Sequence, residues 1–151
     1  GLMAVRGSDG TWSNPTFITL GGGSFGFQAG VQSADVVLVF RNRRGVDNIV
    51  NGKFTLGADA SVAAGPVGRA AQASTDGQLK AEIYSYSRAR GLFAGIALDG
   101  AVIAIDNRAN RRVYGRDVTA RMILENRVRP QVNAVVGFRD KLEEASAQAA
   151  R

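Results

Sequence analysis

The 151-residue sequence contains no cysteine and no histidine. Without cysteine there is no disulfide framework and no thiolate metal site. Without histidine the chain lacks the side chain whose unperturbed pKa lies nearest neutrality, and therefore the most common general base. We therefore expect no enzymatic activity, no cofactor and no bound metal.

Aromatic residues are scarce at 7%, and only 3 residues are proline. No apolar run approaches the ~20 residues that span a bilayer. No basic helix or base-stacking motif is visible, so we expect no nucleic-acid partner. The 19 glycines favour tight turns and close backbone approach over extended linkers.

What the chain does have is apolar content and arginine. Hydrophobic residues make up 45% of the sequence, which is enough to form the hydrophobic core of one domain. We predict a single domain over residues 1–151, with a β-rich core at 1–116 and a helical tail at 117–151. The net charge of +6 is carried by 16 arginines and 3 lysines. This excess favours anionic partners, although codon bias in a GC-rich genome explains the preference for arginine over lysine equally well.

Short strands separated by turn residues dominate the first two thirds. Asp35–Phe40 is almost continuously apolar, which is typical of a strand covered on both faces. Asp99-Gly100 is the strongest short hairpin signal. The predicted strands are Leu2–Arg6, Thr16–Leu20, Ser24–Val31, Asp35–Phe40, Phe54–Val62, Ala81–Tyr86, Leu92–Leu98 and Ala101–Ile105.

Helices are expected at three places. Arg44–Asn51 would bury Val46, Ile49 and Val50, and Thr119 can cap a short helix that runs through Glu125. A longer helix is predicted to start at Pro130. Its apolar stripe would be Val132, Val135, Phe138, Leu142, Ala145 and Ala149, with Glu143 and Glu144 solvated on the opposite face.

These elements predict an α+β fold: a compact, antiparallel, β-rich core, barrel- or sandwich-like, with short helices and a C-terminal amphipathic helix packed on it.

Several motifs that could carry chemistry are incomplete. Gly21–Gly26 matches the spacing of a dinucleotide loop, but the residues after it alternate as a strand, so no helix N-terminus is available for pyrophosphate. Ser85 and Ser87 have no base to activate them as nucleophiles. Asp106, Asn107 and Asn110 lack the spacing of a calcium loop, and we interpret them as a surface loop.

Arginines cluster at three points, and these are the candidate sites for lipid or other anions. Aspartates lie near each cluster, so ordinary solvated chain ends are an equal interpretation. Four arginines at an anionic membrane would contribute ~4 kcal/mol, which corresponds to millimolar binding, so a second contribution is required. The candidates are Arg41, Arg43, Arg44, Arg88, Arg90, Arg108, Arg111 and Arg112.

Taken together, several segments resemble the SYLF domain family, whose members include bacterial secreted or lipid-anchored proteins, yeast actin-patch proteins and animal proteins with a Src-homology 3 domain. The resemblance covers roughly residues 1 to 116. The matching segments are Gly10–Pro15, Ser24–Gly30, Gln32–Asp35, Gly57–Arg69, Ser85–Gly95 and Val113–Gly115.

The resemblance implies binding rather than catalysis. Its expected partners are phosphoinositides or other anionic lipid headgroups at a membrane surface, and actin filaments for the yeast members. The chain is expected to lack the family's N-terminal segment, which includes an amphipathic helix tied to membrane insertion. We expect a location in the bacterial periplasm or cell envelope, with lipid anchoring through a removed N-terminus. The alternative is a cell-envelope interaction scaffold whose tail helix meets a protein partner.

Overall fold

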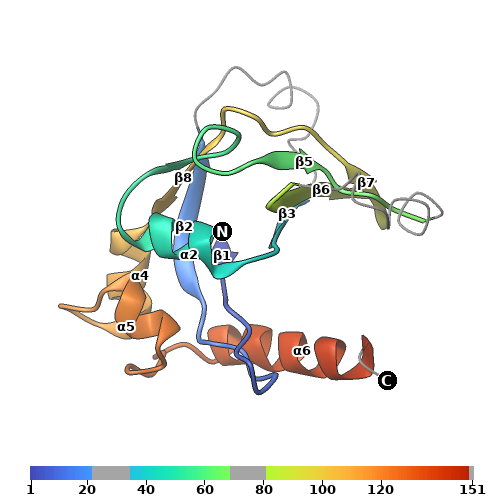
Figure 1. The fold of residues 1–151 in the computed structure, drawn as a ribbon. Coiled ribbons are helices and arrows are strands. Elements are labelled where there is room, and N and C mark those ends of the chain that lie inside the picture. Colours follow the sequence, from blue (N-terminus) through green and yellow to red (C-terminus); the bar gives the residue numbers. More distant parts are fainter. Residues whose placement is uncertain (22–34, 69–80, 150–151) are drawn as a thin grey trace. The chain divides into compact units, whose positions relative to one another are not determined.

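The computed structural model describes residues 1–21, 35–68 and 81–149 (Figure 1). The chain divides into two compact units. The terminal unit contains Gly1–Thr19 and Ala104–Arg151, and the central unit contains Leu20–Ile103. The predicted strand Ser24–Val31 and most of the glycine motif Gly21–Gly26 lie outside the described residues. The class is α+β with a C-terminal helix, as predicted.

The terminal unit begins with a strand pair. β1 (Leu2–Met3) pairs antiparallel with β2 (Thr16–Gly21), and Met3 lies opposite Thr16. The last residues of β2 belong to the central unit, as do the first residues of β8 (Val102–Ile105). Both strands belong to a sheet whose strand order is β1-β2-β8-β4. Both N-terminal strands were predicted, although the first is shorter than expected.

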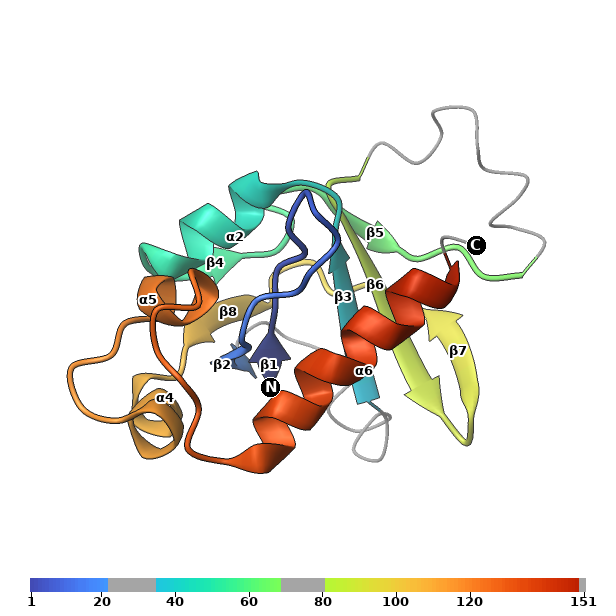
Figure 2. The same ribbon diagram turned by 90° about the horizontal axis from the view of Figure 1, so that it is seen from below.

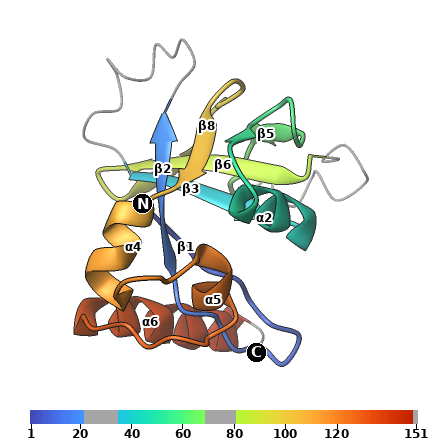
Figure 3. The ribbon, with the colours of Figure 1, turned by 90° about the vertical axis from the view of Figure 1, so that its left-hand side faces the viewer.

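Three helices complete the terminal unit (Figure 3): α4 (Asn107–Tyr114), α5 (Ala120–Leu124) and α6 (Asn133–Ala149). The short helix is confirmed, because the Thr119 side chain accepts a hydrogen bond from the backbone N–H of Met122 at the start of α5. A small core of Tyr114, Ile123 and Val135 joins one residue from each helix.

Two predictions for this unit were wrong. Asp106, Asn107 and Asn110 do not form a surface loop, because the Asp106 carboxylate accepts from Ala109 N and caps α4, and Asn107 and Asn110 lie within this helix. The long helix starts at Asn133 rather than Pro130, and Phe138 of the predicted stripe is exposed. Val132 precedes the helix and Ala145 is also exposed; the inward face carries Val135, Arg139, Leu142, Glu143 and Ser146.

The central unit is built around one long strand. β6 (Ile83–Ala89) pairs antiparallel with β3 (Asp35–Phe40) along one edge. Its other edge is shared, first by β5 (Val62–Ala64) in parallel and then by β7 (Leu92–Gly95) in antiparallel. Outside this sheet, β4 (Phe54–Thr55) pairs with the first half of β8.

The remaining element of the central unit is α2 (Arg43–Val50), where the sequence predicted a helix. Val46 and Ile49 are buried as expected, whereas Val50 is half-buried. Gly45 lies against the Phe40 ring, where a Cβ would come within 2.8 Å of the ring carbon. The largest fully buried apolar side chains here are Ile49, Phe54, Leu56, Ile83, Leu98 and Ile103.

Three predictions for the central unit were wrong. Phe54–Val62 is not one strand, because Gly57 has a φ of +89° and the Asp59 carboxylate accepts from Thr55 N, closing a turn between β4 and β5. Asp99-Gly100 does form a turn, but it joins no hairpin: β7 pairs with β6, and β8 pairs with β4.

The third correction concerns β3, which is not covered on both faces. Val37 and Val39 alternate with half-buried neighbours and are 40% and 45% exposed. In the described part of the chain, no helix is long and apolar enough to cross a membrane.

Candidate functional site

The exposed side of the β3–β6–β7 sheet is the surface on which the sequence-predicted arginines and apolar side chains meet. Register places Val37 opposite Tyr86 and Val39 opposite Tyr84. Side chains of opposing residues share one face of a sheet, while Ile83, Ser85 and Ser87 of β6 are buried on the other. We call this exposed side the outer face; its residues are Asp35, Val37, Val39, Arg41, Tyr84, Tyr86, Arg88 and Phe93.

Two arginines on the outer face lie over aromatic rings. The Arg41 Cζ is 5.2 Å from the centroid of Tyr84, and its Nη1 donates to the Ala81 carbonyl at 3.2 Å. The Arg88 Cζ is 5.8 Å from the centroid of Phe93, which lies opposite it on β7. Stacking of this kind holds a guanidinium in place over the ring.

The shared edge of β6 is fixed by close packing and by one buried serine. The Ser85 Oγ lies 3.2 Å from the Ala63 carbonyl of β5 and 2.5 Å from the Ile96 carbonyl after β7. A Cβ on Gly95 would lie 2.4 Å from the Gly65 carbonyl oxygen, so the backbone segments at these two positions pack too closely for any residue but glycine at position 95. Ser85 therefore has a structural role, because its hydroxyl links β6 to β5 and to the segment after β7.

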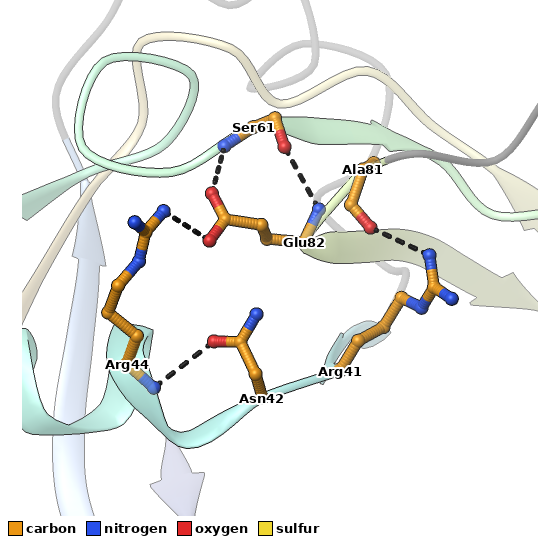
Figure 4. Close-up of polar contacts among 6 residues, drawn as sticks. All are labelled: Arg41, Asn42, Arg44, Ser61, Ala81 and Glu82. Atoms are coloured by element: carbon orange, nitrogen blue, oxygen red, sulfur yellow. Dashed lines mark hydrogen bonds and ion pairs between the residues drawn. The ribbon is translucent and has the colours of Figure 1, made fainter.

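Arg44, in the first turn of α2, is part of a structural cluster with Glu82 and Ser61 (Figure 4). Its guanidinium pairs with the Glu82 carboxylate, which also accepts from Ser61 N at 3.2 Å. The Ser61 hydrogen bond and the Arg44 charge hold the pKa of Glu82 below its usual value. The Asn42 side chain caps the helix by accepting from Arg44 N.

β6 and β7 form an antiparallel hairpin, whose turn joins the head of the β6 arrow to the tail of the β7 arrow in Figure 2. Arg90 and Gly91 form the two-residue loop, with φ of 51° and 78°. Positive φ at both positions is what a type I′ hairpin requires. Leu92 and Phe93 directly after the turn are 76% and 52% exposed.

The candidate arginines divide between the two units. Arg41, Arg43, Arg44, Arg88 and Arg90 belong to the central unit. Arg108, Arg111 and Arg112 lie at positions i, i+3 and i+4 on the exposed side of α4, where the last two also complement the negative end of the helix dipole. Their role in binding anions stays a prediction.

The resemblance motif Gly10–Pro15 makes contacts with α6 and the segments around it. Asn14 makes three of these contacts. Its backbone N–H donates to Asn126 Oδ1 at 2.7 Å, and its Nδ2 donates to the Val128 carbonyl at 3.1 Å. Its Oδ1 accepts from Arg139 Nη1 at 2.7 Å. Glu143 was predicted to be solvated, which is wrong, because its carboxylate accepts from Trp12 N at 3.1 Å. These motif residues hold the terminal unit together.

Tyr114 belongs to the same framework. Its hydroxyl donates to the Pro15 carbonyl at 2.5 Å, and Asn110 bonds both Thr16 Oγ1 and Phe17 N. Burial raises the pKa of Tyr114 to about 12, against the smaller opposing effect of the Arg139 charge. In residues 1–21, 35–68 and 81–149, no cluster of histidine, cysteine, aspartate or glutamate could hold a metal ion.

Fold and surface together define a class: a small α+β module that presents arginine, aromatic and aliphatic side chains on one face of a sheet. The comparisons name it more closely. The family model Ysc84, described as "Las17-binding protein actin regulator", matches residues 21–145. The chain therefore belongs to the Ysc84 family, which confirms the resemblance to SYLF domains.

Curated relatives agree with this assignment. The chain is 38% identical over 133 residues to LAS seventeen-binding protein 3 of Saccharomyces cerevisiae, covering 86% of the chain and 29% of that protein. It is 39% identical over 131 residues to the SH3 domain-containing protein PJ696.02 of Schizosaccharomyces pombe, covering 85% and 30%. It is 34% identical over 125 residues to the human SH3 domain-containing YSC84-like protein 1, covering 82% and 36%.

The chain thus spans about a third of the length of the curated relatives it matches. These relatives are eukaryotic, and the expected bacterial envelope location stays a prediction. No solved structure matches the chain.

Proposed function

We propose that this chain is a non-catalytic module that binds anionic membrane surfaces through the arginines of its central unit. The observation that supports this best is the outer face itself. It combines two stacked guanidinium groups, Arg41 and Arg88, with the exposed Val37 and Val39. Arginine recognises lipid phosphate groups in bidentate fashion, and valine side chains suit the apolar side of a membrane interface.

The arginines of the central unit differ in how well they can attract anionic headgroups. Screening reduces attraction beyond ~8 Å at physiological salt, so only arginines that approach the headgroups contribute. Arg43, Arg88 and Arg90 are exposed, whereas Arg44 is paired with Glu82. Asp35 lies in register with Arg88 and offsets part of its charge. Arg43 and Arg90 are therefore the better candidates for direct contact, and Arg88 lies two residues before Arg90 on β6.

A charge-matched pair of variants tests this proposal. Arg88→Gln with Arg90→Gln and Arg127→Gln with Arg129→Gln each remove two positive charges, the second pair from an exposed segment of the terminal unit. At about 1 kcal/mol for each arginine, the first pair is expected to weaken binding to phosphatidylserine-containing vesicles roughly 30-fold. The second is expected to have little effect. Equal losses in both would show that net charge, and not the outer face, governs binding.

A second candidate function is protein binding, favoured by the family description as a Las17-binding actin regulator. In this case a protein of the actin machinery, or an envelope protein, would occupy the outer face. Co-sedimentation with actin filaments in the absence of lipid tests it. Loss of filament binding in the Arg88→Gln, Arg90→Gln variant, with vesicle binding unchanged, would favour the protein partner.

A further inference from the structure

We infer that the tip of the β6–β7 hairpin inserts Leu92 and Phe93 into the interfacial layer of an anionic bilayer. This inference rests on the proposed function and names the part of the surface that enters the membrane. It also supplies the apolar contribution that arginines alone lack, since four of them reach only millimolar affinity at ~1 kcal/mol each.

The tip is exposed on both sides. Every residue from Arg88 to Ala94 is exposed, in contrast to Ile83, Ser85 and Ser87 nearer the start of the same strand. Leu92 lies opposite Ala89, and Phe93 lies opposite Arg88, so the two apolar side chains point to opposite faces of the ribbon. Leu92 is 76% exposed, so its transfer from water into an apolar layer is favourable.

The base of the hairpin is held firmly, so little order has to be gained on insertion. Ile96 N and Gly65 N both donate to the Ser85 carbonyl, at 3.2 Å and 2.8 Å. The Tyr86 ring covers Gly65, and its hydroxyl donates to the Pro66 carbonyl at 3.2 Å. A preorganised tip binds with a smaller loss of conformational entropy than a flexible one.

The charge pattern selects an anionic membrane as the occupant. From Ile83 to Leu98 the sequence contains two arginines and no aspartate or glutamate. Arg88 is stacked over Phe93, and Arg90 lies in the turn itself. As the tip enters, the flexible arginine side chains would extend back so that both guanidinium groups lie at the level of the phosphates, while Leu92 and the Phe93 ring lie deeper.

The absence of cysteine allows a direct test. Leu92→Cys gives the full chain one thiol, which can carry an environment-sensitive fluorophore; Ala145→Cys on the exposed side of α6 is the control. With phosphatidylserine-containing vesicles, the label at 92 is expected to shift to the blue and to be quenched by lipids brominated on the acyl chain. The label at 145 is expected to change little. A label at 92 that stays in water while the protein sediments with the vesicles overturns insertion and leaves the proposed function standing.

Substitutions give the second readout. Leu92→Ser is expected to weaken vesicle binding roughly tenfold or more. The exposed apolar residues Val132 and Phe138 of the terminal unit provide matched controls, and Val132→Ser or Phe138→Ser should leave binding unchanged.

The remaining outcomes are also decisive. If neither the parent chain nor the labelled one sediments with anionic vesicles, the proposed function fails together with this inference. If Leu92→Ser dissociates a dimer, or abolishes binding to actin filaments, while vesicle binding is unchanged, the tip is a protein contact and insertion is overturned.

Discussion

The indole Nε1 of Trp12 donates a hydrogen bond to the Ser146 Oγ at 2.8 Å, although 134 residues separate them. The backbone N–H of the same tryptophan donates to Glu143, which lies one turn earlier on α6. Two donors of one residue thus fix the helix against the loop between β1 and β2. This relationship gives the Gly10–Pro15 motif a structural role.

Removing either partner of this hydrogen bond is expected to destabilise the fold. Trp12→Phe keeps an aromatic ring but removes the donor, and Ser146→Ala leaves the indole N–H without its acceptor. Each should lower the free energy of unfolding by about 1 kcal/mol, measured by urea denaturation and circular dichroism. Combining the two should cost less than the sum of the single losses. Strict additivity would mean that the two residues act independently.

Truncation of the chain after Pro130 is expected to unfold the terminal unit. It removes Arg139, Glu143 and Ser146 from the motif loop, and Val135 from the core formed with Tyr114 and Ile123. The loss of a buried apolar contact together with several partly buried hydrogen bonds exceeds what a marginally stable fold tolerates. Circular dichroism and amide hydrogen exchange measure the outcome. A truncated chain that kept its cooperative unfolding would show that α6 is a dispensable appendage.

The raised pKa of Tyr114 predicts a loss of stability in alkaline solution. Because the folded state holds the proton up to about pH 12, while an unfolded tyrosine ionises near the ordinary value of 10.0, the contribution is complete below pH 10 and is lost as the pH rises through about 12. The Tyr114→Phe variant is the control, since it removes this titration and keeps the other two tyrosines of the sequence. Urea unfolding should show a shallower loss of stability in the variant over this interval. Identical slopes would contradict the shift.

Two glycines should respond to alanine in opposite ways. In Gly65→Ala the new Cβ would lie 2.2 Å from the Tyr86 ring, so we expect a loss of about 1–3 kcal/mol. In Gly137→Ala nothing lies within 4 Å of the new Cβ, and alanine in the interior of α6 should add about 0.5–1 kcal/mol. Thermal unfolding of both variants checks the pair; a tolerated Gly65→Ala would mean that the Tyr86 ring can move away.

The elements that the sequence predicted well have local signals. Thr119 caps α5, and the spacing of Val46 and Ile49 matches the buried side of α2. The helix α4 was missed because its residues are polar and carry no clear apolar stripe, although Asp106 was available as a capping signal. A local signal can also mislead, since Asp99-Gly100 makes a turn whose flanking strands pair elsewhere.

The pairing of β6 with three strands depends on contacts between distant residues, which no local periodicity reveals. For the same reason the sequence suggested the arginines but not their setting. That Arg41 lies over Tyr84 and Arg88 over Phe93 follows only from the register of β3, β6 and β7. The exposure of Leu92 and Phe93 could have been suspected from Arg90-Gly91, but this dipeptide is a weaker hairpin signal than Asp-Gly.

The measurement that tests the central claim most directly is co-sedimentation of the full chain with phosphatidylcholine vesicles, with and without phosphatidylserine, over a series of salt concentrations. The account predicts that the protein sediments with the anionic vesicles and not with the neutral ones, and that added salt weakens this binding. Equal sedimentation with both kinds of vesicle, or binding that salt does not change, would contradict it.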